Sequence, residues 1–264
     1  MNAFNTSRWI GIAGLVMFVG GCAQGLSQQQ RAWFTGGKDC YARKDYARAV
    51  ESLGRFLIEV REGREAAEAL YIRGMSNAQL GRRQMAYVDL RTCAQVAAGR
   101  PDMAAQAYVV LGTLHFEDEQ WGAAAQSYRA AADRLQNTPP KDHVLFRLGI
   151  CRERLGQWRL ALGHYAELTR LFSSGQYVKP ALRRLDLRAD YFAVQCGAFR
   201  TQTNARNLVT DLTRKGLNVN IREETRGRTP LYVVLAGRYE NYDDARGQLE
   251  MIKKNFVPDA LLWP

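Results

Sequence analysis

The chain has few of the residues that build metal or redox sites. Its 264 residues include three histidines and five cysteines, and no Cys-x-x-Cys pair or Cys/His ligand spacing occurs. A P-loop, a Gly-x-Ser-x-Gly elbow and a Rossmann glycine pattern are also missing. The carboxylates lie beside Arg and Lys, as at Glu153, which is typical of a solvated helix face. We therefore expect no enzymatic activity, no metal and no cofactor.

Long apolar runs are missing as well. Beyond the first 22 residues no apolar segment reaches the roughly 18 residues that a transmembrane helix needs. With 47% hydrophobic and 24% charged residues, the chain can build a core of one or two domains, which excludes a fully disordered or collagen-like protein. The net charge of +11 favours an anionic partner such as phospholipid, glycan-linked carboxylates or nucleic acid, and charge alone does not choose among them.

The first residues have the pattern of an export signal. Arg8 precedes an apolar run, Trp9 to Val19, which is too short to span a bilayer, and small residues follow. The segment Val19-Gly-Gly-Cys22 resembles the lipobox of bacterial lipoproteins. That resemblance implies that residues 1–21 are a signal peptide and that Cys22 carries a lipid anchor. The alternative is an ordinary signal peptide, cut near residue 21, which leaves Cys22 as an incidental thiol.

The resemblance also bears on localisation. Residue 23 is Ala rather than Asp, which in lipoproteins implies passage to the outer membrane. Residues 22–30 then form a lipidated polar tether, and the protein is expected in the cell envelope, on the periplasmic face of the outer membrane. Several acyl chains together give stable membrane attachment without a transmembrane helix.

A pattern repeats every 37 to 38 residues in the middle of the chain. Four glycines are each followed 12 residues later by alanine, preceded by a large apolar residue at four positions before, and followed by another at 16 positions after. These glycines are Gly37, Gly74, Gly112 and Gly149, and the alanines are Ala49, Ala86, Ala124 and Ala161. Such small residues predict two antiparallel helices that cross closely, with the large residues filling the space between neighbouring pairs.

This pattern resembles the tetratricopeptide repeat (TPR). It departs from that family in length, by three or four residues beyond the roughly 34 usual ones, and at Arg83, which replaces the turn aromatic. The resemblance implies a solenoid of about four helix pairs over residues 31–172, closed by a helix near Pro180 within a capping and linker segment, 173–188.

In TPR proteins the concave face typically binds peptides or partner proteins. The inward-facing positions carry over to seven residues, which make a candidate groove for an envelope protein: Phe34, Lys38, Tyr41, Tyr71, Phe116, Phe146 and Arg154. The alternative for each is that it packs between repeats or faces solvent.

The last 76 residues have a different period. Alternating apolar residues appear from Tyr191, and the segment matches itself at an offset of 40, as at Gly197 with Gly237 and Arg206 with Arg246. Two halves of strand, helix and strand predict a β-α-β-β-α-β domain with a four-stranded antiparallel sheet and both helices on one face. Strands are expected at 217–222 and about 257–263. The helix-facing set is Phe192, Val194, Cys196, Val219, Ile221, Tyr232, Val234 and Ala236.

The run Tyr191-Phe-Ala-Val-Gln-Cys-Gly-Ala-Phe199, followed by Asn204-Ala205 and by Tyr232 to Gly237, resembles the SPOR (sporulation-related) domain. This resemblance covers residues 189–264 and implies binding of peptidoglycan glycan strands stripped of their stem peptides. Val233 and Leu235 stand where that family commonly has arginines.

The other sheet face supplies the candidate glycan-binding residues. They combine amides, a guanidinium and flat apolar surface, suited to sugars: Gln195, Asn218, Asn220, Arg222, Val233 and Leu235. The alternative is a partly solvated face covered by the tether or by the solenoid. An RNA-recognition fold has the same strand order, but it needs stacking aromatics that this face lacks, so no nucleic acid is expected.

The sequence therefore predicts a multidomain α plus α/β protein and a non-enzymatic, lipid-anchored envelope scaffold. Its SPOR-like domain would bind glycan and its TPR groove a protein, in cell division or wall remodelling. The alternative is an outer-membrane or secretion assembly factor that acts through TPR contacts; a weaker one is an accessory subunit of a wall hydrolase or synthase. Cys40, Cys93, Cys151 and Cys196 are expected as buried free thiols rather than disulfides.

Overall fold

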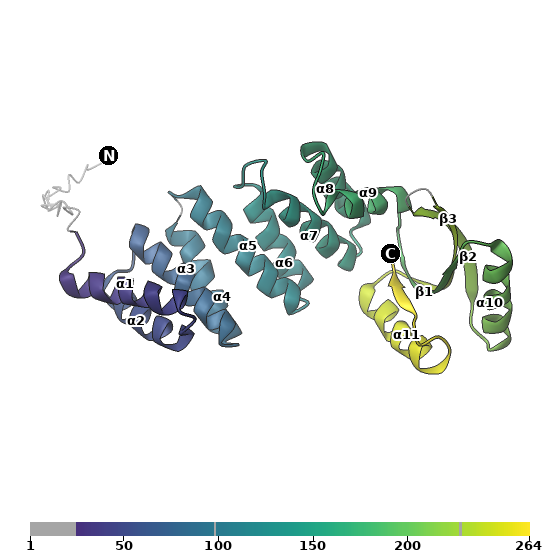
Figure 1. Ribbon diagram of the computed structural model, residues 1–264, viewed down its shortest axis with the longest axis horizontal. Helices are drawn as coiled ribbons and strands as arrows, with labels where there is room; N and C mark the ends of the chain where they lie inside the picture. The colour runs from purple at the N-terminus through teal and green to yellow at the C-terminus, as the bar shows by residue number, and fades with distance from the viewer. Residues whose placement is uncertain (1–24, 98, 227–228) are drawn as a thin grey trace, which may run out of the picture.

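The computed structural model describes residues 25–97, 99–226 and 229–264 as a helical solenoid followed by a small α/β domain (Figure 1). The fold class expected from the sequence is confirmed. Cys22 and the expected signal peptide lie outside the described residues. In the described part of the chain, no helix is both long and apolar enough to cross a membrane.

Eight helices form the four pairs of the solenoid, and a ninth, α9 (Val178–Leu187), closes it. The pairs are α1 (Gln28–Ala42) with α2 (Tyr46–Glu59), α3 (Arg64–Gln79) with α4 (Arg83–Val96), α5 (Pro101–Glu117) with α6 (Trp121–Ala132), and α7 (Lys141–Arg154) with α8 (Trp158–Leu171). The turn within each pair places one residue in the left-handed region, at Lys44, Gly81, Glu119 and Gly156. The same turn geometry therefore recurs at the sequence period.

The four repeat glycines make room for a large side chain of their own pair. A Cβ at Gly149 would lie 2.4 Å from the Tyr165 ring, and one at Gly37 2.5 Å from Leu53. The residue 16 positions later thus packs on the glycine itself, which corrects the expectation that it fills the space between pairs. The four alanines are buried, so the repeat spacing records helix contact within a pair.

The C-terminal domain is a sheet of order β2-β3-β1-β4 with every neighbouring pair antiparallel. Its elements are β1 (Phe192–Phe199), α10 (Gln202–Arg214), β2 (Val219–Arg226), β3 (Thr229–Tyr239), α11 (Tyr242–Asn255) and β4 (Leu261–Trp263). Strand β2 runs four residues beyond the expected end, because it stays paired with β3 up to Arg226 opposite Thr229. Strand β4 is shorter than expected, since turns at Pro258 and Asp259 precede it.

The helix-facing core follows the predicted alternation, with one exception. Val194, Cys196, Val234 and Ala236 pack with residues of α10 and α11 in one buried cluster. Phe192 instead packs on Trp158 of the solenoid and on Tyr242, because the β1–β3 ladder shifts register between Phe192 and Val194.

The four cysteines of the described residues are free. Cys93, Cys151 and Cys196 are buried and Cys40 is half-buried. Burial raises the pKa of Cys93 and Cys151 to about 12, so these thiols are protonated and unreactive near neutral pH.

Candidate functional site

The sheet face away from α10 and α11 brings most of the predicted glycan-binding residues together. Gln195 of β1 lies opposite Leu235 of β3 on one side and Leu261 of β4 on the other. Leu235 in turn lies opposite Asn220 of β2, so one row crosses the whole sheet. The amides of Asn218 and Asn220 are exposed and Gln195 is half-buried. This row keeps polar groups at the surface.

The neighbouring row is closed by Trp263. This residue pairs with Ala193 across β4 and β1, and its indole N–H donates to Glu224 Oε1 at 2.6 Å. Because β4 and β2 lie at opposite edges of the sheet, the ring extends over the strands between them. Trp263 is 1% exposed, and Val233 beneath this row is fully buried.

The solenoid cap closes the same row from above. Leu187 at the end of α9 and Ala189 belong to one buried cluster with Ala193, Leu235 and Trp263. The Arg222 guanidinium donates to the Leu187 carbonyl oxygen and lies 4.6 Å from the Trp263 ring centroid. The alternative of a face covered by the solenoid therefore holds for this half of the sheet.

The expectation of an open apolar platform at Val233 and Leu235 needs correction, since both are fully buried. Glycan binding by Gln195, Asn218, Asn220 and Arg222 stays a prediction. Sequence reasoning missed Trp263, although it stands two residues after Leu261 in the same short strand and so shares its face.

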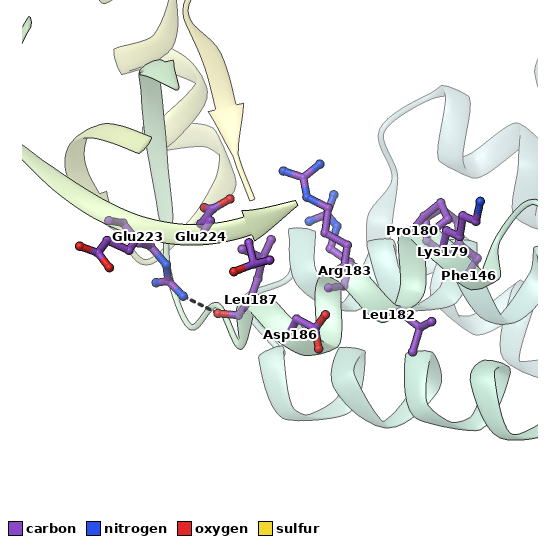
Figure 2. Close-up of a pocket in the computed structure, with 12 residues that line it drawn as sticks. Phe146, Lys179, Pro180, Leu182, Arg183, Asp186, Leu187, Glu223 and Glu224 are labelled. Carbon is purple, nitrogen blue, oxygen red and sulfur yellow. Dashed lines mark hydrogen bonds between the residues drawn. The ribbon is translucent and has the colours of Figure 1, made fainter. Parts of the chain in front are cut away.

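A cleft of about 870 Å³ separates α9 from β2 (Figure 2). Helix α9 contributes Lys179, Leu182 and Arg183, among others, and β2 contributes its four consecutive residues 222–225. In Figure 2 the bond from Arg222 to the Leu187 carbonyl closes one end of this cleft. Both domains therefore build it.

A second junction lies between α11 and the inner turns of the solenoid. The Arg154 guanidinium is 3.8 Å from the centroid of the Tyr242 ring, whose edge also meets Trp121 and Phe192. Burial lowers the pKa of Arg154, although the residue stays a cation at neutral pH. Arg246 of α11 pairs with Glu119. Arg154, a predicted groove residue, thus contacts the C-terminal domain.

The other six groove candidates are mainly engaged in packing. Phe34 is buried against Phe56, Lys38 pairs with Glu68 at 2.5 Å, and Tyr41 contacts Tyr46.

Phe116 packs on Trp121 under the Arg147 guanidinium, and Phe146 packs on Tyr165 and Tyr177. Tyr71 lines a hollow of about 450 Å³ between α3 and α5, and Phe146 lines the cleft beside α9. The structure therefore spreads these residues over several surfaces, and partner binding by them stays a prediction.

The buried charges have structural partners. Burial raises the pKa of Glu153, while the Arg184 guanidinium at 2.8 Å acts in the opposite direction. Arg73 and Asn77 both donate to the Asp89 carboxylate. Among the described residues, no group of three or more His, Cys, Asp or Glu side chains could hold a metal ion. These ion pairs join helices of the solenoid to one another.

Comparison with known proteins identifies the two parts. Residues 189–262 match the family model of the SPOR domain, and residues 143–174 match that of the tetratricopeptide repeat. Both families are binding modules rather than enzymes. The comparison with curated proteins gives no match.

Solved structures of MamA resemble the chain. A crystal structure of MamA protein has a TM-score of 0.50 at 16% identity, covering 62% of this chain and 82% of the other. MamA residues 41 to the end from Desulfovibrio magneticus RS-1 have a TM-score of 0.49 at 16% identity, covering 62% and 85%. At this identity the first likeness shows the fold alone.

Proposed function

We propose that this protein is a non-enzymatic scaffold of the cell envelope that binds peptidoglycan glycan strands through residues 189–264 and a partner protein through its solenoid. The observation that carries the proposal is the SPOR match over residues 189–262. The row Gln195, Asn220 and Leu261 supports it, because amides can pair with sugar hydroxyls while an exposed leucine packs on a ring face.

Co-sedimentation of the full chain with purified sacculi tests this proposal, with and without amidase treatment to remove stem peptides. We expect the protein to pellet, and to pellet more after amidase treatment. Gln195→Ala should weaken pelleting, whereas Gln202→Ala on the exposed face of α10 is the matched control. Equal pelleting of both variants would remove Gln195 from the site, and no pelleting under either condition would overturn glycan binding.

The anchor is a separate part of the proposal. Cys22 would hold the protein in the outer membrane, so that lipid and glycan contacts act together on one bound partner. Metabolic labelling with a radioactive fatty acid should label the wild-type chain and spare Cys22→Ser. Septal fluorescence of a tagged protein would support a role in cell division, and a uniform envelope signal would count against it.

A second candidate function is an outer-membrane or secretion assembly factor. The covered row at Trp263 favours it, because a sheet face occupied by the solenoid leaves less surface for a glycan. In that case the C-terminal domain acts as a protein-interaction module, and the full chain should fail to pellet with sacculi while residues of the solenoid still crosslink to envelope proteins.

A further inference from the structure

The two edges of the sheet differ in length. Strand β4 has three residues, whereas β2 has eight and pairs only with β3 among the described residues. An unpaired edge of this length presents backbone N–H and C=O groups to another extended chain. Strand β2 is therefore the edge at which strand addition is possible.

The ladder between β2 and β3 indicates which backbone groups point outward. Thr225 lies opposite Pro230, and proline has no N–H to donate. This pair cannot exchange two hydrogen bonds, so it is a non-hydrogen-bonded pair, and the N–H and C=O of Thr225 point away from β3. Because the pattern alternates, the same groups of Glu223 also point outward.

The cleft beside α9 runs along that edge. Successive side chains of a strand point to opposite faces, yet the four consecutive residues 222–225 all line the cleft. A hollow that touches all four must lie beside the strand rather than over one face. Glu223 and Thr225, whose backbone groups point outward, are both exposed (Figure 2).

The opposite wall of the cleft is basic and partly apolar. Lys179 and Arg183 of α9 are exposed, and Leu182 is 45% exposed between them. Arg184 also lines the cleft, but it pairs with Glu153. The α9 wall thus offers cations and an apolar side chain to whatever lies against β2, and Asp186 is its one lining acid.

We propose that the cleft between α9 and β2 binds an extended, acidic segment of a partner protein, which adds as a strand to the β2 edge. Main-chain hydrogen bonds to Glu223 and Thr225 hold the segment, and alternate acidic side chains face Lys179 and Arg183. This site is distinct from the glycan row at Gln195, which lies across the sheet on β1.

The test uses the full chain and a fluorescent eight-residue peptide that alternates glutamate and valine. Fluorescence anisotropy measures its dissociation constant, against a peptide in which lysine replaces glutamate. Thr225→Pro removes the outward N–H and keeps the ladder to β3, while Thr225→Val retains this N–H. Lys179→Glu with Arg183→Glu tests the basic wall, and Arg64→Glu with Arg91→Glu is the control of equal charge change.

We expect the glutamate peptide to bind at least tenfold more tightly than the lysine peptide. Thr225→Pro and the α9 double variant should each lose at least tenfold, and the two controls should bind like wild type. An unchanged far-UV circular dichroism melt shows that Thr225→Pro is folded. Equal binding by folded Thr225→Pro overturns strand addition, and no binding of the glutamate peptide at millimolar concentration overturns the site. Sacculus binding should be unchanged in every variant, so failure here leaves the proposed glycan function standing.

Discussion

The solenoid and the C-terminal domain are both built by internal duplication, yet they bury their surfaces differently. In the solenoid each repeat glycine is covered by the side chain 16 positions later in its own pair, as at Gly112 and Tyr128. In the C-terminal domain the two similar halves cover one sheet face with α10 and α11. The other face is closed by Leu187, Ala189 and Trp263, which have no equivalent in the duplication.

This difference teaches that a repeat predicts only those contacts made within and between its copies. A side chain contributed once, such as Trp263, can cover a face that alternation leaves open. The comparison predicts that the protein is sensitive at different kinds of position in its two parts, and each part can be tested separately.

The largest expected effect is that of Trp263→Ala. It removes a buried ring and leaves the Glu224 carboxylate without its indole donor, which should cost about 3 to 5 kcal/mol of unfolding free energy. Leu261→Ala, in the same strand but exposed, should change it by less than about 0.5 kcal/mol. Chemical denaturation followed by circular dichroism measures both. Equal, small losses would mean that Trp263 does not close the sheet face.

How far the sequence predicts the molecule follows from the same distinction. The helix pairs, the cap and the helix-facing set of the sheet could be predicted, because each leaves a period in the chain. The burial of Val233 and Leu235 could not, because it depends on how α9 and Trp263 sit on the sheet. Of the candidate site, alternation placed Gln195 and Asn220 on one face but could not say what covers their neighbours.

Acid should weaken the solenoid first. Burial and the nearby Arg129 and Arg152 lower the pKa of His164 to about 4, while an unfolded histidine titrates near 6.5. The unfolded chain then binds more protons between these values, so stability is complete above about pH 6.5 and falls by about 3 kcal/mol toward pH 4. The lowered pKa of His143 acts in the same direction. The C-terminal domain contains no histidine.

Denaturant unfolding at pH 7.5 and pH 4 measures this loss. His164→Gln cannot gain the proton, so its stability should fall less between the two pH values than that of the wild type. Parallel falls for both proteins would show that His164 is not the acid-sensitive group.

The repeat glycines give a smaller effect within the solenoid. Gly149→Ala places a Cβ 2.4 Å from the Tyr165 ring, and the resulting overpacking should cost about 1 to 3 kcal/mol. Gly163→Ala, in the same helix pair, has nothing within 4 Å and should stabilise the helix by up to about 1 kcal/mol. Thermal melts of the two variants should therefore shift in opposite directions, and shifts of the same sign would contradict the close contact at Gly149.

The smallest effect expected is at the junction, where the duplication is broken. Tyr242 stands at the position equivalent to Gln202, but it contacts the Arg154 guanidinium at 3.8 Å. A double-mutant cycle with Tyr242→Leu and Arg154→Met should give a coupling of about 0.5 to 2 kcal/mol. The same cycle with Gln202→Leu in place of Tyr242→Leu should give none, because α10 carries no such contact with the solenoid. A coupling at Tyr242 alone would show that one half of a duplicated domain has been adapted to hold the solenoid, and equal values at the two positions would show that it has not.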